Sequence, residues 1–104
     1  MRAGLIAFAM TLSAALVTPA SAETIKVTID KVAYAPVKIS ARVGDTIEWS
    51  NVDFVAHTST ARDKSFDLMV MPNKKQTLTV RTAGEFDYYC KFHPNMTGHI
   101  SVKE

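Results

Sequence analysis

The chain has 104 residues, of which 47% are hydrophobic, and its formal net charge is +2 with the histidines neutral. Such a length allows one domain with a modest core and leaves no room for a second domain of ordinary size. The near balance of charge does not favour nucleic acid as a partner, and the single cysteine excludes an internal disulfide.

The first 22 residues are typical of a secretory signal peptide. Arg2 is followed by an uncharged apolar run over residues 3–17, and Ala20-Ser21-Ala22 has the small-x-small pattern of a signal-peptidase site. A transmembrane anchor is the alternative, but this run is shorter than the roughly 20 residues that span a bilayer. We therefore expect cleavage after Ala22 and a mature domain over residues 23–104 that is soluble in the periplasm.

The mature chain has the pattern of an all-β domain. Apolar and polar residues alternate with the period of half-buried strands over residues 24–29, 37–43, 46–50, 76–81, 86–90 and 99–103. No segment has a convincing helical period. Residues 52–72 are the least regular part, and there we expect a long connection or a weak edge strand over residues 66–69. Short strands separated by turns predict an all-β sandwich or barrel.

Three aromatic residues are expected in the core of this sandwich. Trp49 and Phe86 lie on the apolar faces of their predicted strands. Tyr88 shares the face of Phe86, so its hydroxyl needs a hydrogen-bond partner if the side chain is buried.

The segment Cys90-Lys91-Phe92-His93-Pro94-Asn95-Met96 carries the strongest chemical signal. Its thiol, imidazole and thioether are spaced three residues apart and follow a predicted strand, so a tight loop at the rim can bring them to one point. These donors suit copper that changes between two oxidation states, whereas magnesium and calcium take oxygen ligands. Metal binding would also protect an unpaired thiol in an oxidising compartment.

A copper site of this type has two histidines, one cysteine and a distant axial methionine. The loop supplies three of these ligands, and the other histidine is expected to be His57, which lies 33 residues before Cys90. Residues 51–57 could run along a neighbouring strand toward the same rim. His99 begins the last predicted strand, so we expect a surface histidine there and not a fifth ligand.

These residues resemble those of the cupredoxins, the small blue copper proteins of the plastocyanin and azurin group, and most closely the amicyanins. The resemblance runs from Gly44-Asp45-Thr46-Ile47-Glu48-Trp49 through His57 to Ala83-Gly84-Glu85-Phe86-Asp87-Tyr88-Tyr89-Cys90, and the short Cys-x-x-His-Pro-x-Met loop is its most specific part. It implies a cupredoxin-like Greek-key β-sandwich with one type 1 copper ion at a rim. It also implies that His57, Cys90 and His93 are equatorial ligands and Met96 the axial ligand.

The resemblance further implies an electron carrier and not an enzyme, with copper changing between Cu(I) and Cu(II). Amicyanin-like proteins carry electrons from an amine dehydrogenase to a c-type cytochrome. We therefore expect a periplasmic dehydrogenase and such a cytochrome as redox partners, no nucleic acid or membrane partner, and a monomer in solution.

By the same resemblance, the ring edge of His93 would reach the surface inside an apolar patch, for which Phe92, Pro94 and Val55 are candidates. Positive charge nearby would favour an acidic redox partner by electrostatic steering. The candidates for this charge are Lys91 and residues 62–64 and 74–75, although an ordinary solvated surface is the simpler interpretation of them.

The chain departs from the amicyanin pattern at two positions of the site. Thr58 follows the first histidine, where amicyanin-like proteins usually have an asparagine that ties this strand to the ligand loop; a hydroxyl can still donate there. Phe92 stands where the family commonly has proline. A backbone N–H at Phe92 could bond to the sulfur of Cys90 and favour Cu(I), so we hypothesise a higher reduction potential than in a Phe92→Pro variant.

Two alternative functions use the same residues. A periplasmic copper carrier or chaperone on this fold would deliver metal instead of electrons. Met69 and Met71 could hold Cu(I) weakly in such a protein, although same-face packing on an edge strand is the simpler interpretation. A Cys–His nucleophilic enzyme would need a substrate cleft and oxyanion donors, for which the sequence gives no signal. Four protein ligands leave no coordination position for a substrate, which favours the electron carrier.

Overall fold

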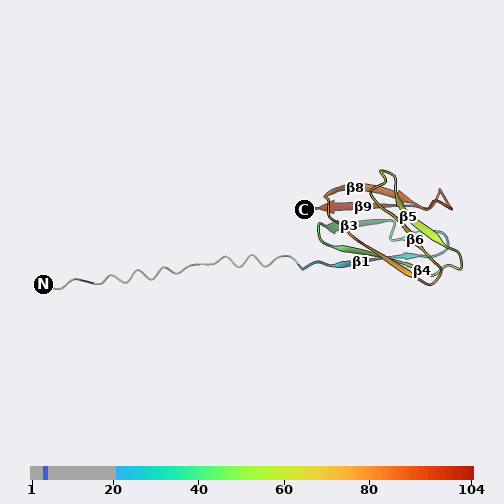
Figure 1. Ribbon diagram of the computed structural model, residues 1–104, viewed down its shortest axis with the longest axis horizontal. Helices are drawn as coiled ribbons and strands as arrows, with labels where there is room; N and C mark the ends of the chain where they lie inside the picture. The colour runs from blue at the N-terminus through green and yellow to red at the C-terminus, as the bar shows by residue number, and fades with distance from the viewer. Residues whose placement is uncertain (1–3, 5–20) are drawn as a thin grey trace.

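The computed structural model describes Gly4 and residues 21–104, and residues 24–103 contain two β-sheets that pack face to face (Figure 1). The signal peptide predicted for residues 1–22 lies almost wholly outside the described residues. Within the described part of the chain, no helix is long and apolar enough to cross a membrane.

The strands of the described residues are divided between the two sheets. They are β1 (Thr24–Ile29), β2 (Tyr34–Ala35), β3 (Lys38–Arg42), β4 (Thr46–Asn51), β5 (His57–Ala61), β6 (Asp67–Val70), β7 (Lys75–Thr79), β8 (Gly84–Tyr89) and β9 (Thr97–Lys103). One sheet has the order β2-β1-β4-β7 and the other the order β3-β9-β8-β5-β6. The pairings of β1 with β4 and of β3 with β9 are parallel, and all others are antiparallel. The predicted all-β sandwich is confirmed.

The core between the sheets is built from the apolar faces of the predicted strands. Trp49 and Tyr88 have no exposed surface, and Phe86 packs against this core as a partly buried residue. The indole N–H of Trp49 donates to the Tyr88 hydroxyl at 3.3 Å, which supplies the partner that this buried phenol requires. Burial raises the pKa of Tyr88 to about 12. The aromatic residues therefore occupy the positions that the sequence predicted.

Two strands differ from the sequence expectation. Four of the five residues of β5 are polar, so β5 lacks the alternation of apolar and polar residues that predicts the other strands. All five residues of this strand are nevertheless buried. It lies between β8 and β6 in the five-stranded sheet, and this position covers its side chains. The two-residue strand β2 pairs with β1 and was also not predicted. The edge strand expected over residues 66–69 is β6, which does lie at the edge of its sheet.

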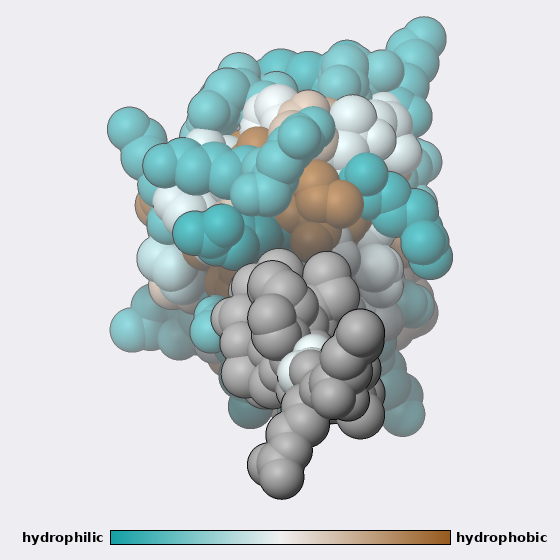
Figure 2. Space-filling model, turned by 90° about the vertical axis from the view of Figure 1, so that its left-hand side faces the viewer, coloured by the Kyte–Doolittle hydropathy of each residue, from teal (hydrophilic) through white to brown (hydrophobic). Residues whose placement is uncertain are grey.

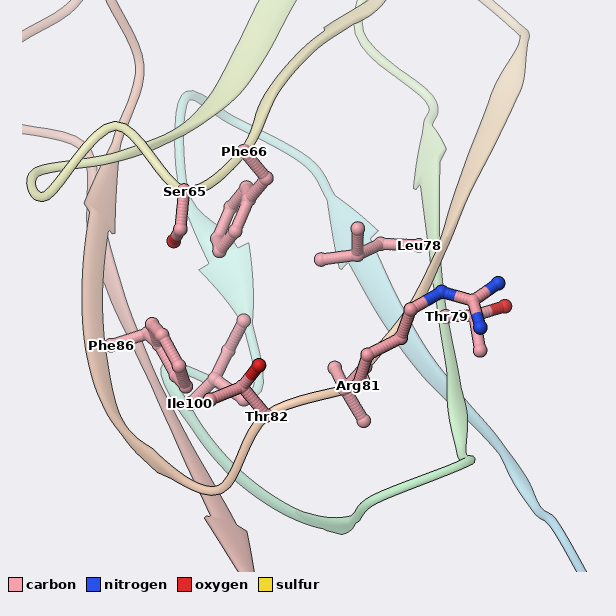
Figure 3. Close-up of a pocket in the computed structure, with 9 residues that line it drawn as sticks. Ser65, Phe66, Leu78, Thr79, Arg81, Thr82, Phe86 and Ile100 are labelled. Atoms are coloured by element: carbon pink, nitrogen blue, oxygen red, sulfur yellow. The ribbon is translucent and has the colours of Figure 1, made fainter.

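A cleft opens between the two sheets beside β7, away from the predicted ligands. Figure 3 shows Phe66, Leu78 and Phe86 around it, with Arg81 as the one charged residue of its lining. Cys90 does not line this cleft, so it provides no substrate pocket beside the thiol.

Candidate metal centre

The ligand loop connects β8 to β9 and is closed by its own backbone. The Cys90 N–H donates to the Met96 carbonyl at 3.0 Å, so the two ends of the loop lie side by side. Within the loop, the His93 N–H donates to the Cys90 carbonyl at 3.2 Å, and the Met96 N–H donates to the His93 carbonyl at 2.8 Å. Two successive turns therefore hold the three residues at the end of the sandwich opposite the C terminus (Figure 1).

The structure brings His57, Cys90 and His93 together around one point. The Cys90 sulfur lies 3.7 Å from Nδ1 of His57 and 3.7 Å from Nδ1 of His93, and the three donor atoms are all within 4.8 Å of one another. His57 and Cys90 are fully buried, whereas His93 is partly exposed. Met96 lies in the same loop and is buried. These residues come from β5 and from the loop after β8, which are adjacent in the sheet.

The spacing of the three donors fits a metal ion in trigonal coordination. With bonds of about 2.3 Å to thiolate sulfur and about 2.0 Å to imidazole nitrogen, as for zinc, trigonal geometry separates sulfur from nitrogen by about 3.7 Å. Both observed separations are 3.7 Å. One thiolate and two imidazoles, with a thioether in the same loop, are the donor set of a type 1 copper site. The residues present therefore fit copper.

Asp53 holds the imidazole of His57 through Nε2, the ring nitrogen that does not face Cys90. Its Oδ2 lies 2.8 Å from Nε2 of His57. An ionised carboxylate can only accept, so Nε2 carries the proton and Nδ1 directs its lone pair toward the Cys90 sulfur. A carboxylate in this position sets the orientation of a metal-binding histidine and raises its basicity. No pattern in the sequence predicts this role for Asp53.

The turn between β1 and β2 holds Asp53 in place. Asp53 accepts hydrogen bonds from the N–H groups of Lys31 at 2.8 Å and Val32 at 3.0 Å. Both donors have positive φ, 52° and 58°, a conformation that is rare for a β-branched residue such as Val32. The Val32 amide first, then the Lys31 amide and the His57 imidazole, keep the pKa of Asp53 below its usual range. Asp53 is therefore preorganised as a charged acceptor for His57.

The Cys90 sulfur accepts a backbone hydrogen bond from Thr58 N–H at 3.3 Å. Among the described residues no hydrogen bond runs from the Phe92 N–H to this sulfur, so the structure does not support the mechanism hypothesised for Phe92, and the higher potential than in Phe92→Pro stays a prediction. The backbone turns at Cys90 and His93 direct other amides toward loop carbonyls, and the side chain of Phe92 is exposed.

Thr58 also ties β5 to the ligand loop, the role that asparagine usually has in amicyanin-like proteins. Its hydroxyl accepts the Lys91 N–H at 2.9 Å, so the side chain acts as an acceptor here and not as the expected donor. On the other side, the Tyr34 hydroxyl donates to the Thr58 carbonyl. The departure from asparagine therefore leaves the connection between strand and loop intact.

The other candidate residues lie outside this group. His99 has both ring nitrogens engaged, Nδ1 at 2.7 Å from Asp87 and Nε2 at 2.6 Å from Glu85, and these hydrogen bonds raise its pKa. It is a residue of the outer surface, not a fifth ligand. Met69 and Met71 are about half exposed at the edge strand β6, and neither belongs to the core.

Exposed apolar side chains lie on the loops that carry the candidate ligands. Phe54 is 94% exposed, and Val55 and Phe92 are each about half exposed. Phe54 and Val55 precede His57, and Phe92 precedes His93. At the opposite end of the sandwich, which faces the viewer in Figure 2, the visible surface is hydrophilic at the rim with an apolar area between. The exposed Phe54, Val55 and Phe92 agree with the apolar patch expected near His93.

Part of the positive charge expected near the site is paired with carboxylates. Lys91 Nζ lies 2.6 Å from Asp67, and Lys75 Nζ lies 3.5 Å from Glu48. Such pairs cancel charge that would otherwise act on an approaching partner. Steering by Lys91 and Lys75 is therefore weaker than the sequence indicated.

The chain matches the family model of the cupredoxin-like domain over residues 2–102. It is similar to amicyanin from Paracoccus versutus, with 28% identity over 79% of this chain and 67% of the relative. It is also similar to amicyanin from Paracoccus denitrificans, with 32% identity over 76% of this chain and 65% of the relative, so it spans about two thirds of their length. A solved structure of a reduced amicyanin variant, with phenylalanine in place of a proline, has a TM-score of 0.67 and 32% identity, covering 77% of this chain and 82% of that chain.

Proposed function

Since this chain belongs to the cupredoxin family, we propose that it is a periplasmic blue copper protein that transfers single electrons. His57, Cys90 and His93 would hold the copper as equatorial ligands, and Met96 as the axial ligand. When bound, copper would supply the one-electron couple between Cu(I) and Cu(II). The observation that carries the proposal is a buried thiol flanked by two imidazole nitrogens, each at 3.7 Å.

The residues of the candidate site are held by hydrogen bonds, and we propose that they keep their positions when the charge at the site changes. Asp53 fixes His57, the Thr58 N–H fixes the Cys90 sulfur, and the turns of the loop fix His93. Donors that need little rearrangement between two oxidation states favour fast electron transfer, and burial of the thiol keeps water away from the sulfur.

His93 is the part of the candidate centre that reaches the surface, and we propose it as the route for electrons. Apolar side chains such as Phe54 and Phe92 provide a surface against which a partner can dock briefly. We propose a periplasmic dehydrogenase as the donor and a c-type cytochrome as the acceptor, with this chain acting as a monomer. Export would follow from the cleavage expected after Ala22.

The burial of Cys90 favours a carrier over an enzyme. A nucleophilic cysteine must be accessible to its substrate, and Cys90 has no exposed surface. A set of four protein ligands would also leave no open coordination position for a substrate. We therefore propose that the chain has no catalytic activity of its own.

Copper delivery is the second candidate function, and one observation favours it. Met69 lies on β6, the strand beside β5, and Met71 follows its end; both residues are about half exposed, so their thioethers are accessible to a transferred Cu(I) ion. A delivery protein would release copper to a competing ligand, whereas an electron carrier retains it in both oxidation states.

Voltammetry of the copper-loaded protein in the presence of a Cu(I) chelator tests these two functions against each other. For an electron carrier we expect a reversible one-electron wave whose amplitude stays constant over many cycles. A wave that decays as copper passes to the chelator, and decays more slowly in a Met69→Leu/Met71→Leu variant, would contradict electron transfer and support delivery.

A further inference from the structure

We infer that Asp67 is a positioning residue for the ligand loop and acts on it through Thr60 and Thr58. Asp67 is the first residue of β6 and lies opposite Thr60 in the register of β5 with β6. This inference rests on the proposed function, because it concerns how the copper-binding loop is held. We call Thr58, Thr60 and Asp67 the threonine relay.

Both ends of the threonine relay are bonded to Lys91, the residue after Cys90. Lys91 N–H donates to Thr58 Oγ1 at 2.9 Å, and Thr58 Oγ1 lies 2.8 Å from Thr60 Oγ1. Thr60 Oγ1 donates to Asp67 Oδ1 at 2.8 Å, and Lys91 Nζ donates to Asp67 Oδ2 at 2.6 Å. The closed circuit thus joins the ligand loop to both β5 and β6.

The carboxylate of Asp67 sets the direction of the bonds in the relay. Because it can only accept, Thr60 uses its single hydroxyl proton toward Asp67. Thr60 must then accept from Thr58, which leaves the Thr58 oxygen to accept the Lys91 N–H. Without Asp67 the hydroxyls are free to reverse, and the Thr58 oxygen would then accept from Thr60 as well as from the Lys91 N–H.

The buried hydroxyls matter more to this arrangement than the exposed ion pair. Thr58 has no exposed surface and Thr60 is 7% exposed, so neither hydroxyl can exchange its partner freely for water. The side chains of Lys91 and Asp67 are 45% and 52% exposed, and pairs of this kind contribute little. Loss of the threonine relay is therefore expected to disturb the loop more than loss of the ion pair.

Thr58 transmits the effect of the relay to the sulfur. Its backbone N–H donates to Cys90 Sγ, while its hydroxyl holds the N–H of Lys91. One residue therefore contacts both the thiol and the peptide that follows it. Where amicyanin-like proteins usually have one amide side chain, this chain has two hydroxyls that end on a carboxylate.

Thr60→Val is the sharpest test, because it removes one hydroxyl and changes no charge. We expect its affinity for Cu(II), measured by competition with a chelator, to fall by about tenfold, as for other residues that orient metal ligands. The thiolate-to-copper absorption band should shift as well. Thr79→Val, on the other sheet, is the matched control and should leave both readouts unchanged, since among the described residues the Thr79 hydroxyl contacts only the Thr46 hydroxyl, at 3.5 Å.

Two further variants test whether the relay acts as a unit. Asp67→Ala should lower the affinity, and a Thr60→Val/Asp67→Ala double variant should lose no more than the larger single loss, since both changes break the same path. Thr58→Asn in the Thr60→Val background should restore the affinity, because an amide can tie the strand to the loop without Thr60.

Unchanged affinity and an unchanged band in Thr60→Val would overturn the inference, and so would fully additive losses in the double variant. If the parent protein binds Cu(II) with an intense blue band and only the variants behave contrary to expectation, this inference alone fails. If the parent shows no such band, the proposed function fails with it.

Discussion

Replacing Asp53 with alanine is expected to weaken Cu(II) binding by about ten- to a hundredfold and to raise the reduction potential. The carboxylate accepts the N–H of His57 Nε2, with Oδ2 and Nε2 2.8 Å apart, and makes this imidazole a better donor for the more highly charged ion. If the loss is confined to Cu(II), each tenfold loss of affinity raises the potential by about 59 mV for a one-electron couple. Chelator competition in both oxidation states and voltammetry measure the two effects.

Asp30→Ala is the matched control for this prediction. It removes one carboxylate from the turn between β1 and β2, the turn whose amides bind Asp53, and no hydrogen bond joins the Asp30 side chain to His57 in the described part of the chain. Asp53→Asn should have an intermediate effect, since an amide oxygen can still accept from Nε2 without carrying charge. The role assigned to Asp53 is contradicted if Asp30→Ala shifts the potential as much as Asp53→Ala does.

Gly98→Ala is expected to destabilise the fold by about 3 kcal/mol or more. A Cβ at Gly98 would lie 2.4 Å from Cζ and 2.6 Å from the hydroxyl oxygen of Tyr88. Tyr88 has no exposed surface and is packed against Trp49 and Tyr34, so its ring has no space into which it can move. Thermal unfolding of the apoprotein should show a melting temperature lowered by roughly 10 °C or more, as for a domain of this size.

A second substitution tests whether the steric overlap with Tyr88 is the cause of the destabilisation. Tyr88→Leu removes the atoms that the new Cβ would meet, at a cost of its own. The Gly98→Ala/Tyr88→Leu double variant should then be little less stable than Tyr88→Leu alone. If the losses of the two single variants add in full, the close approach of Gly98 to Tyr88 is not the cause.

Most strands could be predicted because one of their faces packs into the core. β1 has the predicted bounds, and β3, β4, β6, β7, β8 and β9 begin and end within two residues of the predicted ones. β5 could not be found in this way. Its sequence His57-Thr58-Ser59-Thr60-Ala61 is mostly polar, and it is buried because of its place between two other strands, which local periodicity does not reveal.

The candidate ligands could be predicted because three of them lie in one short loop with a distinctive donor set. The residues that hold those ligands could not. Asp53 depends on amides from a turn 21 and 22 residues away in sequence, and Asp67 depends on the register of β5 with β6. In both cases the chemistry is ordinary for a carboxylate, and only the tertiary structure shows what it contacts.

The most direct measurement for the central claim is the visible absorption spectrum after one equivalent of Cu(II) is added to the mature protein and to its Cys90→Ser variant. We predict an intense blue thiolate-to-copper band in the parent, bleached reversibly by reductant and absent from the variant, because the Cys90 sulfur lies between two imidazoles. A weak band in the parent, or an equal band in Cys90→Ser, would contradict a blue copper site built on this thiol.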